Sequence, residues 1–308
     1  MKKTYANFLV LLLALAAFAA CGISETERHE LTLQEKKRLW REDSAALKVA
    51  VMPTLDCLPA YVAQDRGWFD TLNVRLKVFT AQMDCDTAIQ RGRVEGAFTD
   101  LVRAERMIQH GTPLRYASAT NAYWQLITNR KARLTKLSQL DDKMLAMTRY
   151  SVTDLLGDLV VDSVKLKTER VFRIQVNDVY VRQKMLQAGI MDALFFTEPQ
   201  ATQGRLLKNP VLLDTRKLDM QMGAIVFSEK ALEGKNRERQ MQHFVKGYNR
   251  ACDSLNRLGL HAYDDVIAQH YDISRAAIDS LPRKLNFLPA AQPRVKDIER
   301  ARAWLKKK

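Results

Sequence analysis

Cysteine and histidine are scarce in this chain of 308 residues, which contains four cysteines and five histidines. A small disulfide scaffold needs a higher cysteine density, and a zinc site needs histidines and cysteines that converge at regular spacing. We therefore expect no metal and little dependence on disulfides. Glycine and proline are also few, at 12 and 8 residues. The composition is that of a globular protein with one large or two medium-sized domains.

Sequence motifs of common enzymes and nucleic-acid binders are absent as well. There is no G-x-S-x-G elbow, no P-loop and no dinucleotide fingerprint. The net charge is +14, but no arginine-rich helix or aromatic-basic interleaving accompanies it, so we expect a solvated basic surface and no nucleic-acid partner. We assign no catalytic residue and no cofactor.

The first twenty residues have the pattern of an export signal. Lys2 and Lys3 precede the run "FLVLLLALAAFAA", which has the length of a signal-peptide core and is short for a membrane span. Small residues then lead to Cys21, as in a bacterial lipobox, although Phe18 stands where leucine is usual. We predict a lipoprotein signal peptide at 1–20, lipidation at Cys21, and a charged tether at 21–46 that is helical around 32–42. The alternatives are an ordinary secretory signal followed by a chance cysteine and an uncleaved anchor helix.

Cleavage after residue 20 would remove two lysines and no acid, so the net charge would fall from +14 to +12. Three cysteines would remain besides the lipidated one: Cys57, Cys85 and Cys252. Cys57 and Cys85 each follow an aspartate, in loops that we expect at one sheet edge. A disulfide between these two cysteines is left open, because the sequence does not show their separation.

From Leu47 onward, short apolar runs alternate with amphipathic stretches, which is typical of parallel sheets covered by helices. Two such series are present, and strand-like segments at 123–130 and 222–228 connect one to the other and back. From about residue 228 the pattern is almost wholly helical. We predict an α/β protein with two lobes facing a cleft: lobe 1 at 47–121 and 221–308, and lobe 2 at 122–220.

Polar residues, many of them acidic, follow nearly every predicted strand. In open α/β sheets, ligands bind beyond the carboxyl ends of the strands. The residues at these ends are Asp56, Asp84, Asp86, Thr99, Asp100, Arg149, Tyr150, Asn177, Asp178 and Glu198. Helix capping explains any single Asp or Asn equally well. Glu198 fits capping less well, because Glu is a poor N-cap and Pro199 suits a first helical turn.

Several carboxylates in one cleft repel one another unless a cation or a hydrogen-bond donor relieves them, which favours a solute with amine or ring N–H groups. Arg149 argues for an anionic group instead, or it pairs with a cleft acid. Tyr123, Trp124 and Tyr150 could stack on a planar ring or belong to the core. The sequence leaves these alternatives open.

Five segments together resemble a known family: "VMPTLDCLPAYVAQDRGWF", "FTAQMDCDTAIQRGRVEGAFTD", "AMTRYSVTD", "QVNDVYVRQKML" and "DALFFTEPQAT". In order and spacing they are similar to the solute-binding lipoproteins of nitrate/taurine-type ABC importers, the NMT1/THI5-like or SsuA-like periplasmic binding proteins. The resemblance implies a type II periplasmic binding fold whose two lobes close on a solute. It also implies delivery to a membrane permease that a separate ATPase drives, by a monomer in the periplasm.

The resemblance, read together with the strand ends, assigns ligand contacts to eleven positions. These are Thr54, Asp56, Met83, Asp84, Thr99, Asp100, Trp124, Arg149, Tyr150, Asp178 and Glu198. The chain departs from sulfonate and nitrate binders in the acidity of these loops. A nitrogenous solute, such as a thiamine-pyrimidine-like molecule, is therefore expected as well as a sulfonate-like one.

Other functions remain as alternatives on the same predicted fold. A thiamine-pyrimidine synthase would need a cysteine-rich cluster and a pocket histidine, and the cysteines here are isolated. A menaquinone-pathway enzyme is cytosolic, which the export signal contradicts. A sensory receptor would bind a solute without importing it.

Overall fold

The computed structural model describes residues 25–69 and 73–308. The predicted signal peptide at 1–20 and the predicted lipidation at Cys21 lie outside the described residues. The chain divides into two compact units, with the division between Ala46 and Leu47. Each unit is described by itself.

The first unit contains one long helix, α2 (Glu25–Ala45), rich in charged residues. Arg38 lies between Glu35 and Glu42 at one-turn spacing, with nitrogen–oxygen distances of 4.0 and 3.7 Å, and these exposed pairs support the helix weakly. The predicted helical stretch at 32–42 is confirmed, and it is longer than expected. In the ranges 25–69 and 73–308, no helix has both the length and the apolar character of a membrane span.

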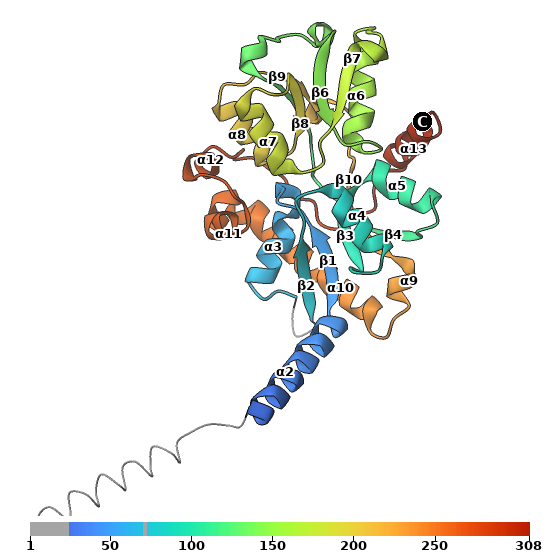
Figure 1. Ribbon diagram of the computed structural model, residues 1–308, viewed down its shortest axis with the longest axis vertical. Coiled ribbons are helices and arrows are strands. Elements are labelled where there is room, and N and C mark those ends of the chain that lie inside the picture. The colour runs from blue at the N-terminus through green and yellow to red at the C-terminus, as the bar shows by residue number, and fades with distance from the viewer. Residues whose placement is uncertain (1–24, 70–72) are drawn as a thin grey trace, which may run out of the picture. The chain divides into compact units, whose positions relative to one another are not determined.

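The second unit, Leu47–Lys308, is built around two five-stranded sheets (Figure 1). We call the part that carries the first sheet lobe 1 and the part that carries the second sheet lobe 2. The first sheet has the order β2-β1-β3-β10-β4. Its strands are β1 (Leu47–Val51), β2 (Val74–Val78), β3 (Gly96–Asp100), β4 (Leu114–Ala119) and β10 (Gly223–Ser228). The second sheet has the order β7-β6-β8-β5-β9. Its strands are β5 (Gln125–Thr128), β6 (Lys143–Met147), β7 (Val171–Gln175), β8 (Ala193–Phe196) and β9 (Val211–Asp214).

Helices join the strands of each sheet, as the alternating pattern predicted. Lobe 1 carries α3 (Leu58–Asp65), α4 (Gln82–Gln90) and α5 (Leu101–Gln109). Lobe 2 carries α6 (Val152–Ser163), α7 (Val179–Ala188) and α8 (Gln200–Leu206). Local signals set their ends. Asp178 caps α7 by accepting two backbone N–H groups, and Gly189 ends it with a φ of 74°, which glycine adopts without strain.

The sheets are parallel, as predicted, in the eight strands of the two alternating series, and the two segments predicted to connect the sheets add one strand to each. β1 pairs in parallel with β2 and β3, and β6 pairs in parallel with β7 and β8. β10 and β5, however, run antiparallel to both of their neighbours. Each of these two strands follows a crossover from the other lobe, so it enters its sheet from the edge where the other strands end.

The two crossovers run side by side and are hydrogen bonded to each other at both ends. Near lobe 1, the backbone N–H of Thr120 donates to the carbonyl of Gly223 (2.9 Å). Near lobe 2, Trp124 and Thr215 exchange two bonds, of 2.9 Å to the threonine hydroxyl and 3.0 Å to the tryptophan carbonyl. Gly223 permits this approach, because a Cβ there would collide with the Thr120 hydroxyl and lie 2.7 Å from the Cβ of Ala122.

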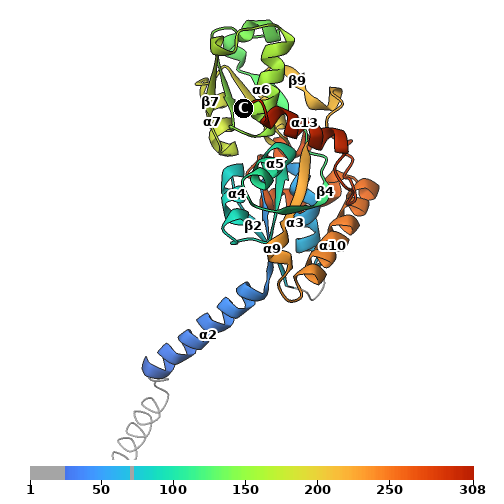
Figure 2. The same cartoon turned by 90° about the vertical axis from the view of Figure 1, so that its right-hand side faces the viewer.

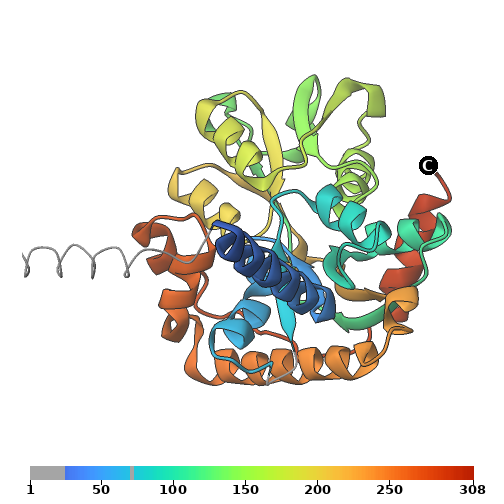
Figure 3. The ribbon, with the colours of Figure 1, turned by 60° about the horizontal axis from the view of Figure 1, so that its bottom comes forward.

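The chain after β10 is helical, as predicted, and packs mainly on lobe 1. Its helices are α9 (Glu229–Leu232), α10 (Arg237–Leu258), α11 (Asp264–His270), α12 (Arg275–Asp279) and α13 (Val295–Leu305). The long helix α10 runs along one face of lobe 1 (Figure 3), where Phe244 stacks on Phe69 and meets Phe227 edge-on at centroid distances of 5.4 and 5.7 Å. These buried rings anchor the tail to the sheet.

Helix α13 contacts both lobes (Figure 2). On the lobe 1 side, the guanidinium of Arg302 pairs with Glu105 on α5 at 2.6 Å. On the lobe 2 side, the indole N–H of Trp304 donates to the carboxylate of Asp158 on α6 at 2.7 Å. The lobes are therefore linked by α13 as well as by the two crossovers.

Candidate ligand-binding site

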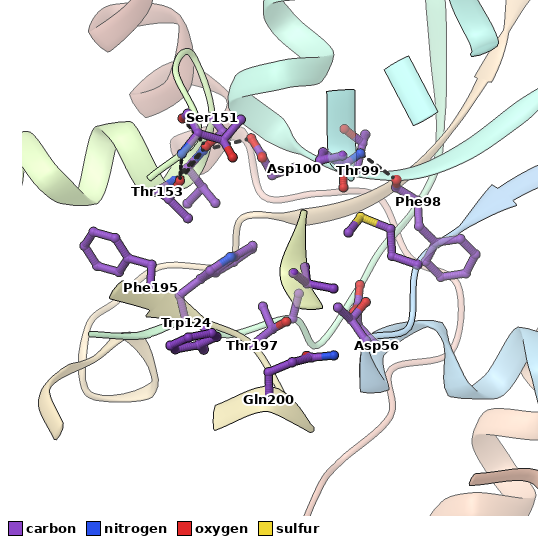
Figure 4. A pocket seen from close by; sticks show the side chains of 18 of the residues that line it. Asp56, Phe98, Thr99, Asp100, Trp124, Ser151, Thr153, Phe195, Thr197 and Gln200 are labelled. Carbon is purple, nitrogen blue, oxygen red and sulfur yellow. Dashed lines mark hydrogen bonds between the residues drawn. The ribbon is translucent and has the colours of Figure 1, made fainter. Parts of the chain in front are cut away.

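A pocket lies between the lobes, where the carboxyl ends of the parallel strands of the two sheets meet (Figure 4). Its lining comes from lobe 1, from lobe 2 and from the first crossover, and its volume is about 80 Å³. One water molecule needs ~10–15 Å³ on the same scale. The pocket therefore has room for a small solute and is walled by both halves of the molecule.

Lobe 1 contributes the loop after β1 and the end of β3. Thr54 and Asp56 lie in the first of these, where the chain passes through a short 3-10 helix, η1 (Leu55–Cys57). Thr99 and Asp100 end β3 and also line the pocket. The structure thus brings together three residues predicted from the strand ends, Asp56, Thr99 and Asp100, because parallel strands direct their carboxyl ends to one edge. Thr54, assigned through the family resemblance, lies beside them.

Asp56 is a carboxylate directed into the pocket and only partly accessible. Burial raises its pKa above the usual range, and hydrogen bonds from the hydroxyls of Thr54 and Thr120 oppose the rise. The Thr120 hydroxyl lies 3.3 Å from Oδ2 of Asp56. Since Thr120 begins the first crossover, this carboxylate touches both the pocket and the connection between the lobes.

Asp100 joins the two lobes by a direct hydrogen bond. Its Oδ1 caps α5 by accepting the backbone N–H of Arg103 at 3.0 Å. The same oxygen accepts the backbone N–H of Val152, the first residue of α6 in lobe 2, at 3.2 Å. Burial raises the pKa of Asp100 to about 7, although the nearby Arg103 and the two backbone N–H groups lower it. The charge state of Asp100 is therefore sensitive to pH near neutrality.

Lobe 2 brings a buried arginine to the opposite wall. The guanidinium of Arg182, on α7, donates to the carbonyls of Val176 (2.6 Å) and Phe195 (3.1 Å) and to the hydroxyl of Thr148 (2.5 Å). No ion pair among the described residues includes Arg182. Burial lowers its pKa to about 10, so it still carries its positive charge at neutral pH.

Aromatic side chains complete the lining. Trp124, predicted as a ligand contact, lies in the wall together with Phe98 and Phe195 (Figure 4). The exchange of hydrogen bonds with Thr215 holds the Trp124 backbone in place. A flat indole beside a small cavity can pack against the apolar face of a solute.

Glu198, the acid that the sequence most readily assigned to a ligand, is instead used within lobe 2. It is 2% exposed and does not line the main pocket. Its Oε1 accepts the hydroxyl of Tyr123 and the guanidinium of Arg205, both at 2.7 Å, and its Oε2 accepts the backbone N–H and the hydroxyl of Thr202. These partners occupy the carboxylate, which borders only a small hollow beside the pocket.

The other five predicted contacts also lie outside the lining: Met83, Asp84, Arg149, Tyr150 and Asp178. Helix α4 begins at Gln82, directly before the predicted contacts, so Gln82 lines the pocket while Met83 and Asp84 are exposed. Asp178 is occupied as the cap of α7 and accepts the hydroxyl of Thr80 at 2.5 Å.

Arg149 and Tyr150 form an exposed turn that lobe 1 contacts from outside the pocket. Arg103 donates to the carbonyl of Arg149 at 3.2 Å, and the guanidinium of Arg106 lies 4.4 Å from the centre of the Tyr150 ring. These two residues therefore meet the facing lobe rather than the cavity.

Sequence reasoning missed several lining residues, among them Ser151, Thr153, Arg182 and Gln200. Ser151 directly follows the predicted pair at 149–150, and Thr153 comes two residues later. The lining therefore begins just after the residues that were predicted. Arg182 stands one turn before the buried Leu186 on α7, and this spacing places it on the inner face of the helix.

The thiol chemistry is now defined for the described part of the chain. Cys57, Cys85 and Cys252 are all free and buried, so the disulfide left open between Cys57 and Cys85 is not formed. Burial raises the pKa of each thiol, to about 12 for Cys252. Across residues 25–69 and 73–308, no group of three or more His, Cys, Asp or Glu side chains is arranged to hold a metal ion.

A two-lobed α/β unit with two crossovers and a pocket between the lobes has the type II periplasmic binding protein fold, and this predicted fold class is confirmed. The solved structures that resemble the chain have the same architecture. The amino-acid sequence itself matches no protein-family profile and no curated protein.

Three of these solved structures define the comparison. The alkanesulfonate-binding protein SsuA from Xanthomonas axonopodis pv. citri superimposes with a TM-score of 0.72 at 16% identity, over 85% of this chain and 92% of that one. The aliphatic sulphonate-binding protein SsuA from Escherichia coli has a TM-score of 0.68 at 15% identity, over 85% of this chain and 92% of that one. The nitrate-binding protein NrtA from Synechocystis PCC 6803 has a TM-score of 0.62 at 13% identity, over 73% of this chain and 65% of that one. The chain thus shares the fold of SsuA- and NrtA-type binding proteins.

Proposed function

We propose that this protein is an extracytoplasmic solute receptor of an ABC importer. It captures a small nitrogenous or sulfonate-like solute between its lobes and delivers it to the permease, which a separate ATPase drives. The protein acts as a monomer and binds its solute without chemical conversion.

The observation that supports this proposal most directly is the pocket of about 80 Å³ with walls from both lobes. A cavity divided between two hinged bodies binds a solute best when the bodies are closed, so the solute shifts the population toward the closed form. The direct bond between Asp100 and the backbone of Val152 belongs to such a closed arrangement. The structural neighbours named as periplasmic sulfonate- and nitrate-binding proteins support the same role.

The placement of the receptor is the second part of the proposal. The signal at 1–20 directs export to the periplasm, and lipid on Cys21 anchors the chain to a membrane. The charged segment at 21–46 then acts as the tether. Radiolabelled palmitate incorporated by the wild type, and lost in Cys21→Ser, would support the anchor; equal labelling of both proteins would refute it.

Native mass spectrometry of the freshly purified full chain tests the receptor role. We expect a small molecule that is retained under gentle conditions and released on unfolding. The function is tested independently by genetics: a permease gene and an ATPase gene beside this one, with loss of uptake on deletion, support import. A neighbouring sensor kinase, with uptake unchanged on deletion, would instead indicate a sensory receptor.

A further inference from the structure

Two buried oxygen atoms in the pocket lack hydrogen-bond partners among the described residues. They are Oγ1 of Thr99 and Oε1 of Gln200, whose residues are 6% and 2% exposed and both line the cavity. A buried polar atom that has given up its hydrogen bonds to water without gaining a partner destabilises the folded state. Native proteins keep few such atoms, and a ligand that pairs with them is one physical reason to do so.

The orientation of Gln200 shows which kind of partner is missing. Its amide nitrogen donates to the carbonyl of Pro53 at 2.9 Å. Rotating the amide by 180° would bring Oε1 against that carbonyl oxygen, so the nitrogen is fixed and the oxygen is left for the pocket. Figure 4 shows the Gln200 side chain extending toward the side of the pocket that carries Asp56. The missing partner of Gln200 is therefore a hydrogen-bond donor.

Asp56 adds a negative charge to these two oxygens. Its hydrogen-bond donors are neutral, namely the hydroxyls of Thr54 and Thr120, the latter at 3.3 Å, and a backbone N–H, and no ion pair in the described part of the chain includes Asp56. A carboxylate that is largely buried and has no cation beside it is stabilised by a cationic or strongly polarised N–H donor.

Arg182 on the opposite wall restricts the solute further. Three of its five N–H groups already donate to protein oxygens, so it contributes a positive potential and at most two further donors. An anion without N–H groups would gain from Arg182 and could accept a hydrogen bond from the Thr99 hydroxyl, but it would face the charge of Asp56 and leave Oε1 of Gln200 unpaired. A solute with an N–H donor at the lobe 1 end avoids both penalties.

Building on the receptor function proposed above, we infer that the solute carries an N–H donor group, an amine, amidine or protonated ring nitrogen, held by Asp56, Thr99 and Gln200. Plain nitrate and alkanesulfonates without an amino group are then excluded as the physiological solute. A sulfonate remains compatible where an amino group accompanies it.

Matched probe pairs test this inference on the full chain by thermal shift and calorimetry. Each pair differs in the donor group: taurine against ethanesulfonate, benzamidine against benzoate, and a wider set of compact amines against their hydroxyl analogues. We expect binding only by the members that carry N–H donors. Removing the charge in Asp56→Asn should weaken that binding roughly tenfold to a hundredfold, the range for a hydrogen bond to a charged group.

Thr99→Val separates a ligand contact from a structural role. Because the hydroxyl has no partner in the protein, its removal should leave the unfolding midpoint of the solute-free chain unchanged or higher, while solute binding weakens. Asp162→Asn is the matched control, because Asp162 is an exposed acid on α6 and lies outside the pocket. It should bind the same probes as the wild type.

The outcomes are distinct for the two proposals. Equal binding of both members of a pair, preference for the member without an N–H donor, or unchanged affinity in both Asp56→Asn and Thr99→Val would overturn the donor inference and leave the receptor function standing. If no probe in the set binds and no small molecule co-purifies, the receptor function itself is refuted.

Discussion

Replacing Asp100 by asparagine should stabilise the protein at neutral pH and leave its stability unchanged in acid. Both hydrogen bonds to Asp100, from the backbone N–H groups of Arg103 and Val152, end on the same oxygen, Oδ1. The amide oxygen of asparagine can accept both, and asparagine caps a helix as well as aspartate does. The substitution therefore removes a buried negative charge while it keeps the contacts.

The size of the effect follows from the pKa of Asp100, which rises from 3.8 to about 7 in the folded protein because the carboxyl is buried. A tenfold change in the proton affinity of the carboxyl corresponds to ~1.36 kcal/mol, so the folded state is destabilised by about 4 kcal/mol once Asp100 is fully ionised. Between about pH 4 and pH 7 the folded chain retains a proton that the unfolded chain has released. The contribution of Asp100 to stability therefore falls as pH rises through this window and is constant above it.

Urea unfolding of the wild type and of Asp100→Asn, followed by tryptophan fluorescence at about pH 4, 5.5, 7 and 8.5, measures this difference. The variant should match the wild type near pH 4 and exceed it by an amount that grows to about 4 kcal/mol above pH 7. Other buried acids cancel in the difference, and Asp162→Asn should show no pH-dependent offset. A variant that is less stable at high pH, or an offset that is independent of pH, would refute the electrostatic account of this residue.

Two other contacts described above, and the burial of two thiols, can be tested by substitution or labelling. Glu198→Ala should lower the free energy of unfolding by about 2–4 kcal/mol, because it removes the ion-pair partner of Arg205 and leaves the buried hydroxyl of Tyr123 without its acceptor; urea unfolding measures the loss. Trp304→Phe should increase the solute-free radius of gyration in X-ray scattering, because it removes the bond from α13 to lobe 2. Ellman's reagent should leave Cys57 and Cys85 unmodified in the native protein and react with both in denaturant.

Each of these has a clear contradicting result. A Glu198→Ala protein of wild-type stability that has lost solute binding would return this residue to the ligand contacts predicted from the sequence. Scattering curves that coincide for the wild type and Trp304→Phe would show that α13 does not influence the distance between the lobes. Rapid modification of native thiols would contradict their burial.

Most of the fold could be predicted from the sequence, because apolar runs and helix caps are local signals. The direction of β5 and β10 could not be predicted, because the same apolar pattern occurs in parallel and in antiparallel strands. Only the path of the whole chain shows that these two strands enter from the facing lobe.

The candidate site could be predicted in part. Asp56 and Asp100 follow from the rule that strand ends meet at one edge, whereas Glu198 obeys the same rule and yet is occupied by other residues. A signal for this was present: Thr202 and Arg205 stand four and seven residues after Glu198, on one face of a helix. The partner Tyr123 is 75 residues away in the sequence, and its contact with Glu198 depends on tertiary packing.

The pairing of the two crossovers bears on how the molecule can open. A single connecting strand would let one lobe swivel as well as tilt, whereas two strands joined to each other by hydrogen bonds resist twisting. The lobes can then move easily only by rotating about a single axis that runs through both crossovers. For the receptor function proposed above, this means that solutes of different shape would enter by the same route, through the rim opposite the crossovers, and that a permease would meet the protein from one direction.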